Sequence, residues 1–162
     1  MPRLYDERDL RLSYVIWQEG VSPIVVVELL SPGTEKEDLG KLESQEQNGK
    51  EDHIGKPPTK WKVYEQILRI PYYVVFSRYT NKMQIFTLQA GHYVELNLSD
   101  PRVWMEEIEM GLGIWEGEYK GISCSWLRWY DAEGNWIPTD AERAERRAEY
   151  LAQRLRELGI EP

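Results

Sequence analysis

Residues 23–34 read PIVVVELLSPGT, and this stretch decides the fold. Its first half is rich in β-branched residues, and Pro23 and the pair Pro32 and Gly33 bound it, which predicts a strand. A run that is apolar on both faces is typical of a central strand that is covered on both sides. One carboxylate, Glu28, stands inside this apolar run. Its charge is costly to bury unless it is paired, hydrogen-bonded or bound to a cation, so Glu28 needs a specific role.

Two interpretations of Glu28 stay open on the residues alone. Glu28 lies near the carboxyl end of its strand, and in open α/β sheets ligand sites usually lie at that end. This position favours a functional carboxylate. The alternative is a structural ion pair with a nearby base, such as Arg11 or Lys60.

Length and composition fit one globular domain with a sizeable core, since the chain has 162 residues and 41% hydrophobic residues. The net charge of −8 argues against a general phosphate-binding surface. A single cysteine, Cys124, fits a reducing compartment. The sequence shows neither an apolar run long enough for a membrane span nor a signal-peptide pattern, so we expect a cytoplasmic protein with no membrane partner.

The elements on either side of the charged loop that follows residue 33 are clear in the pattern. Leu10 to Ile16 alternate apolar and polar residues, which predicts an extended segment. After the loop, Thr59 is a suitable N-cap for a helix over residues 60–70, and Pro71 stops it. Three strands joined by turns then predict a β-meander, at residues 72–79, 83–89 and 92–98.

The C-terminal part is predicted to end in a helix. Residues 101–122, rich in Gly and Trp, suggest irregular structure, and residues 126–138 suggest a hairpin that turns at 133–135. Thr139 with Glu142 forms a capping-box pattern at the start of the helix. We therefore divide the chain into a domain at residues 1–138 and a helical tail at residues 139–162.

The tail carries a heptad-like apolar seam. Its members alternate spacings of four and three: Ala144, Ala148, Leu151, Leu155 and Leu158. One interpretation is a helix that lies on its own domain. The other is a short dimerising coil, and we expect a homo-oligomer. The aromatic residues nearby either pack across a sheet or stack on nucleic-acid bases: Trp126, Trp129, Tyr130 and Trp136.

Three segments in this order resemble a bacterial family of restriction-endonuclease-like proteins, the Uma-type family of the PD-(D/E)xK nuclease superfamily. They are PIVVVELLSPGTEKEDLGK, KWKVYEQILRIPYYVVF and QIFTLQAGHYVELNL, and the resemblance covers about residues 12–98. It implies an α/β fold with a mixed sheet flanked by helices, to which the tail adds a C-terminal helix. It also implies Mg²⁺-dependent hydrolysis of phosphodiester bonds in DNA.

The resemblance assigns roles to three residues of this chain. Glu28 matches the acid on the family's strand and would be a catalytic metal ligand. Lys60 matches the lysine of a Lys-x-x-x-Tyr helix and would act on phosphate or water, although Lys62 and Lys56 are almost as well placed. Asp38 matches the acid of the loop after the strand and would be a second metal ligand. Its alternative is a solvated charge among other charges.

The resemblance also departs from the family pattern. The family's other metal-binding acid is an Asp preceded by Pro on an earlier strand, and neither Asp6 nor Asp9 matches it. In the family, the strand after the helix often ends in an acid, and this chain has Ser77 at that place. We therefore expect an N-terminally shortened fold that holds Mg²⁺ weakly. The alternative function is a non-catalytic, nuclease-like interaction module that oligomerises through its sheet edge or its C-terminal helix.

Overall fold

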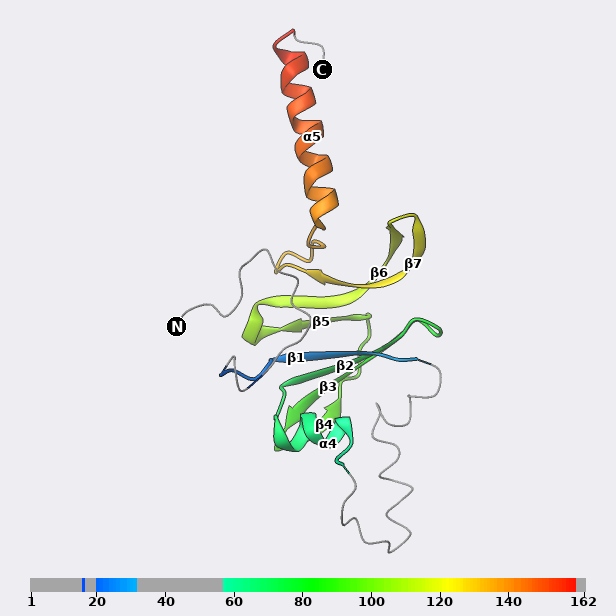
Figure 1. Ribbon diagram of the computed structural model, residues 1–162, viewed down its shortest axis with the longest axis vertical. Coiled ribbons are helices and arrows are strands. Elements are labelled where there is room, and N and C mark those ends of the chain that lie inside the picture. The colour runs from blue at the N-terminus through cyan, green and yellow to red at the C-terminus, as the bar shows by residue number, and fades with distance from the viewer. Residues whose placement is uncertain (1–15, 17–19, 32–56, 160–162) are drawn as a thin grey trace, which may run out of the picture. The chain divides into compact units, whose positions relative to one another are not determined.

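The computed structural model describes residue 16 and residues 20–31 and 57–159, and it comprises two compact units that meet in the chain at Asn97 and Leu98 (Figure 1). The predicted division into residues 1–138 and 139–162 stays a prediction. Neither helix of the described part is long and apolar enough to cross a membrane.

The first unit is built on a four-stranded mixed sheet in the order β1-β2-β3-β4. The strands are β1 (Val25–Leu29), β2 (Tyr72–Ser77), β3 (Lys82–Gln89) and β4 (His92–Glu95). β1 runs parallel to β2, and β3 pairs antiparallel with both β2 and β4. The predicted strand of Glu28 and the predicted β-meander are both confirmed.

The helix between β1 and β2 begins where its N-cap predicts. Thr59 accepts a hydrogen bond at its side-chain oxygen from the N–H of Lys62 at 3.3 Å, which starts α4 (Lys60–Lys62). The chain continues as a π-helical turn, η1 (Val63–Ile67), in which the N–H of Leu68 donates to the carbonyl of Val63 at 2.8 Å. The predicted helix is therefore confirmed in place, with a wider second turn than an α-helix.

Aromatic packing fixes α4 and η1 against one face of the sheet. The buried core of this face consists of Leu30, Tyr73, Val75 and Phe86. Trp61 packs edge-on against three rings, with ring centroids 4.9 Å from Phe86, 5.2 Å from Tyr93 and 5.6 Å from Tyr73. This anchor determines which side chains of the helix face β1.

One buried acid strengthens the same attachment. Glu65 in η1 accepts a hydrogen bond from the backbone N–H of Tyr93 at 2.7 Å, which ties the turn to β4. The Tyr93 hydroxyl donates to the carbonyl of Ile70 at 3.0 Å. Burial, with the Glu65 carboxylate nearby, raises the pKa of Tyr93 well above its usual range, so this hydroxyl stays a donor.

Two predictions for the first unit are wrong where the structure describes them. Ile16 is helical rather than extended, and the N–H of Gly20 donates to its carbonyl at 2.8 Å; the rest of that segment lies outside the described residues. β1 is not covered on both sides in the described part of the chain. Among residues 16, 20–31 and 57–159 it pairs with β2 alone, and Val27 and Leu29 on its second face are 38% and 67% exposed.

The second unit contains an antiparallel sheet in the order β5-β6-β7 and a long helix. The strands are β5 (Arg102–Met105), β6 (Met110–Tyr119) and β7 (Ile122–Tyr130), and a short 3-10 turn, η2 (Glu106–Ile108), joins the first two. The prediction of irregular structure at residues 101–122 is therefore wrong. β6 and β7 form a hairpin that the sequence did not predict. The predicted hairpin at residues 126–138 is present in a short form, because Tyr130 and Trp136 form an antiparallel bridge and the N–H of Ile137 donates to the carbonyl of Trp129 at 2.9 Å.

The glycines of β6 made it look irregular in the sequence, but large side chains lie over them in the structure. A β-carbon at Gly111 would lie 1.9 Å from the ring of Tyr130, and one at Gly117 would lie 2.1 Å from the ring of Trp115. Glycine usually weakens a strand, but here it makes room for these rings. The packing of aromatic residues across the sheet, one of the two predicted alternatives, is confirmed for Tyr130, whose ring lies edge-on to Trp136.

The predicted C-terminal helix is confirmed as α5 (Asp140–Glu157). The capping box is complete, because Thr139 accepts from the N–H of Glu142 while the Glu142 carboxylate accepts from the N–H of Thr139 at 2.7 Å. Glu142 also forms an ion pair with Arg128 of β7. The start of α5 is therefore attached to the β5-β6-β7 sheet.

Candidate active site

Glu28 lies on the face of the sheet that α4 covers. In β1 it stands opposite Val75 of β2. Successive side chains of a strand point to opposite faces, so Glu28 shares a face with Val26 and Leu30. Val26 and Leu30 both belong to the aromatic core beneath Trp61. The Glu28 carboxylate is therefore placed at the margin of that core, with its side chain 19% exposed.

Two side chains of the helix meet the Glu28 carboxylate. The ammonium group of Lys60 lies 3.3 Å from Oε2, and the hydroxyl of Tyr64 donates to Oε1 at 3.0 Å. Lys60 and Tyr64 are four positions apart, and this spacing places them on one helix face, as predicted. Each carboxylate oxygen thus has a donor from the same short helix.

The Lys60 end of this site is open to water. The Lys60 side chain is 42% exposed, whereas Glu28 is 19% exposed. Solvent therefore screens the ion pair and can reach the ammonium group. Lys62 is exposed on the same helix, and Lys56 and Arg11 lie outside the described residues. The geometry thus pairs Glu28 with Lys60, which both interpretations of Glu28 had included.

The other candidate residues do not join Glu28 in the described part of the chain. Asp38, Asp6 and Asp9 lie outside the described residues. Ser77 is buried at the end of β2, and its hydroxyl oxygen accepts from the N–H of Thr80 at 3.4 Å. No group of three or more His, Cys, Asp or Glu side chains suited to a metal occurs among residues 16, 20–31 and 57–159.

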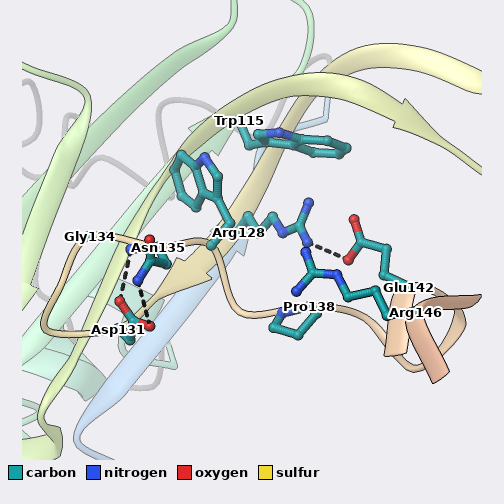
Figure 2. Close-up of a pocket in the computed structure, with 9 residues that line it drawn as sticks. Trp115, Arg128, Asp131, Gly134, Asn135, Pro138, Glu142 and Arg146 are labelled. Carbon is teal, nitrogen blue, oxygen red and sulfur yellow. Dashed lines mark hydrogen bonds and ion pairs between the residues drawn. The ribbon is translucent and has the colours of Figure 1, made fainter. Parts of the chain in front are cut away.

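A separate pocket of about 660 Å³ lies in the second unit, at the start of α5 (Figure 2). Figure 2 shows Arg128 extending beneath Trp115 toward Glu142, and the guanidinium lies 4.5 Å from the Trp115 ring centroid. Two of its four charged side chains, Arg128 and Glu142, form an ion pair, and Asp131 accepts hydrogen bonds from Asn135. Sequence reasoning missed it, because it forms only when β7 and the first turns of α5 come together. It is lined by Trp115, Arg128, Asp131, Gly134, Asn135, Trp136, Pro138, Glu142 and Arg146.

The first unit combines a mixed sheet, which carries an acid on its first described strand, with a Lys-x-x-x-Tyr helix that contacts this acid. This combination defines an α/β protein of the restriction-endonuclease-like class. Residues 3–117 match the model of the Uma2 family, which is described as "Putative restriction endonuclease". The chain belongs to this family. No match was found among curated proteins or among solved structures.

The family match ends within β6. It includes Glu28, Lys60 and Tyr64, so the whole Glu28 site falls inside the matched residues. β7, α5 and most of the residues that line the pocket come after it.

Proposed function

We propose that the protein is a metal-dependent DNA endonuclease and that Glu28 and Lys60 carry the hydrolysis of the phosphodiester bond. The observation that carries the proposal is the convergence of Glu28, Lys60 and Tyr64. Lys60 and Tyr64 are 32 and 36 positions from Glu28 in the chain, yet a polar atom of each side chain lies within 3.3 Å of the Glu28 carboxylate. An acidic residue on a strand, beside a solvent-accessible lysine, is a suitable arrangement for hydrolysis of a phosphodiester bond.

The donor chemistry at Glu28 fits a hard cation in part. Mg²⁺ binds through one or two carboxylates and keeps several waters, and Glu28 offers one carboxylate at the margin of the core. Asp38 is the candidate for the second. A bound Mg²⁺ would supply charge neutralisation at the phosphate and a more acidic water. Because the described residues contribute a single carboxylate, we expect weak binding of the metal.

The protein residues have separate roles in this proposal. Tyr64 holds the Glu28 carboxylate in one orientation through the bond to Oε1. Lys60 forms an ion pair with the other carboxylate oxygen of Glu28, Oε2. Because the Lys60 side chain is partly exposed, its ammonium group can also donate to a phosphate oxygen or to a water. A positive charge is useful here, because the chain carries a net charge of −8 and repels DNA as a whole.

The test is nicking of supercoiled plasmid in Mg²⁺ or Mn²⁺. We expect the wild type to nick, and Glu28→Gln and Lys60→Ala to lose at least about tenfold in rate. Lys62→Ala is the matched control, since it removes an exposed lysine from the same helix, and it should keep the wild-type rate. Equal rates for wild type and Glu28→Gln would reject the role of Glu28.

A second candidate function is a non-catalytic interaction module, and the exposure of β1 favours it. Val27 and Leu29 present apolar side chains on the face of β1 away from α4. A purified chain that does not nick DNA but that associates with itself would support this alternative. A cytoplasmic location and a homo-oligomeric state belong to both proposals.

A further inference from the structure

α5 carries an apolar seam that its own unit does not cover. The helix spans 18 residues, and none of them is buried. Leu151 is 51% exposed and Leu158, at its C-cap, is 73% exposed. Helices in proteins gain most of their stability from packing of an apolar face, and the seam of α5 has little such packing within its own unit. The seam therefore needs a partner.

The attachment of α5 to the sheet lies on the opposite side of the helix from the seam. Glu142 forms an ion pair with Arg128, and Glu142 and Arg146 line the pocket of Figure 2. A second pocket of about 400 Å³ beside it is lined on α5 by Ala141, Glu142 and Glu145. Each residue advances about 100° around a helix. Relative to Glu142, the three charged side chains fall within about 60° of one direction, Ala141 in the first turn falls at about 260°, and the seam from Ala144 to Leu158 falls at about 160–240°. The leucines of the seam therefore lie mostly away from the charged side chains that attach α5 to the sheet, which agrees with the exposure of Leu151 and Leu158.

The charge of α5 selects a second copy of the same chain as the partner. The chain carries a net charge of −8, so two copies repel each other over most of their surface. α5 is the exception, because its five acids are balanced by five arginines: Asp140, Glu142, Glu145, Glu149 and Glu157 against Arg143, Arg146, Arg147, Arg154 and Arg156. A helix of zero net charge with an apolar seam can meet its own copy without that penalty.

The pattern of the seam fits this partner. Spacings of four and three over residues 144–158 are those of helices that pack side by side, with the large Leu residues in the second half. The polar residues lie off the seam, and Arg154 is already paired within the helix to Glu157 at 2.7 Å. We propose that two copies of this chain associate through α5, with Leu151, Leu155 and Leu158 at the contact. This inference does not depend on the nuclease proposal.

The test is the mass of the full chain in solution. We expect sedimentation to show a monomer–dimer equilibrium over micromolar to submillimolar concentrations. Leu151→Glu should weaken the dimer at least about tenfold, since it replaces a buried leucine of each copy with a charge. Tyr150→Glu is the matched control. Tyr150 is a neighbouring apolar residue that is 61% exposed and lies off the seam, so its dimer should stay as stable as that of the wild type.

Three outcomes would overturn the proposal. A wild type that stays monomeric at every concentration would show that α5 has no partner copy. A Leu151→Glu variant that dimerises like the wild type would place the contact elsewhere. Equal loss in the Tyr150→Glu variant would show that the seam is not the contact. Far-UV circular dichroism checks folding, and Leu155→Ala repeats the test with a milder change. Plasmid nicking by a monomeric variant separates this result from the fate of the nuclease proposal.

Discussion

The Glu28–Lys60 pair can be measured by a double-mutant cycle, and the structure gives the expected size. At 3.3 Å two unit charges attract by about 5 kcal/mol at an effective dielectric constant of about 20. Lys60 is 42% exposed, so solvent screening and lost side-chain freedom offset most of this attraction. We therefore expect a coupling free energy of about 0.5–1 kcal/mol between Glu28→Gln and Lys60→Ala.

The assay is urea unfolding of wild type, both single variants and the double variant. Hydrogen exchange at the amides of β2 gives a local check on the first unit, because β1 pairs with β2 beside Glu28. Lys62→Ala replaces Lys60→Ala in the control cycle and should give no coupling. A coupling above about 2 kcal/mol would refute the reasoning and make the pair a structural brace. A coupling of zero would show that the contact does not form in solution.

Three further predictions concern the metal, the helix cap and a glycine. Mg²⁺ should raise the thermal midpoint of wild type but not of Glu28→Gln, because a ligand of the folded state stabilises it. The hydrogen bond from the N–H of Thr139 lowers the pKa of Glu142 below its ordinary 4.5. The stability that Glu142→Gln removes should therefore be complete above pH 4.5 and vanish as the pH falls through the lowered pKa. Gly111→Ala should cost about 1–3 kcal/mol or more in urea unfolding, since its β-carbon would overlap the buried Tyr130 ring.

Each of these predictions has a contrary result. Equal responses of wild type and Glu28→Gln to Mg²⁺ would remove Glu28 from the metal proposal, and Glu95→Gln, an exposed acid on β4, is the control. A free-energy difference for Glu142→Gln that stays constant with pH would contradict the capping argument. A Gly111→Ala variant as stable as wild type would show that Tyr130 can move aside. Gly117→Ala is the comparison, because its neighbour Trp115 is only partly buried and can give way at lower cost.

Local patterns predicted β1, the start of α4 and the β-meander of the first unit, because short-range signals determine these elements. The β-meander follows from alternating strands and turn residues, and Asn81 and Gly91 take the left-handed backbone that its turns require. Thr59 predicted the start of α4 because an N-cap acts within one turn. The spacing of Lys60 and Tyr64 then predicted that both would present one helix face. The side chain that this helix face contacts depends on the pairing register of the sheet, and the sequence pattern does not predict that register.

The second unit could not be predicted in the same way, because distant side chains determine its strands. Gly111 and Gly117 weaken the strand pattern of β6, and only the rings of Tyr130 and Trp115 explain them. Those rings come from β7 and from β6 itself, and they are placed by the sheet. The pocket at the start of α5 depends likewise on the pairing of Arg128 with Glu142 across 14 positions. Short sequence motifs describe residues that are close in the chain, so they do not predict such pairs.

The geometry at Glu28 fits both interpretations that the sequence left open, and one physical argument favours a functional carboxylate. A purely structural role is poorly suited to this position, because Val26 and Leu30 on the same face pack into the aromatic core and an apolar residue at 28 would extend it. Replacing a partly buried ion pair by apolar residues is often neutral or stabilising. The chain instead keeps an acid there, with one donor on each oxygen and with Lys60 facing water. We propose on this basis that the Glu28 carboxylate, oriented by Tyr64 and paired with a partly exposed Lys60, serves a ligand, which the double-mutant cycle and the response to Mg²⁺ test.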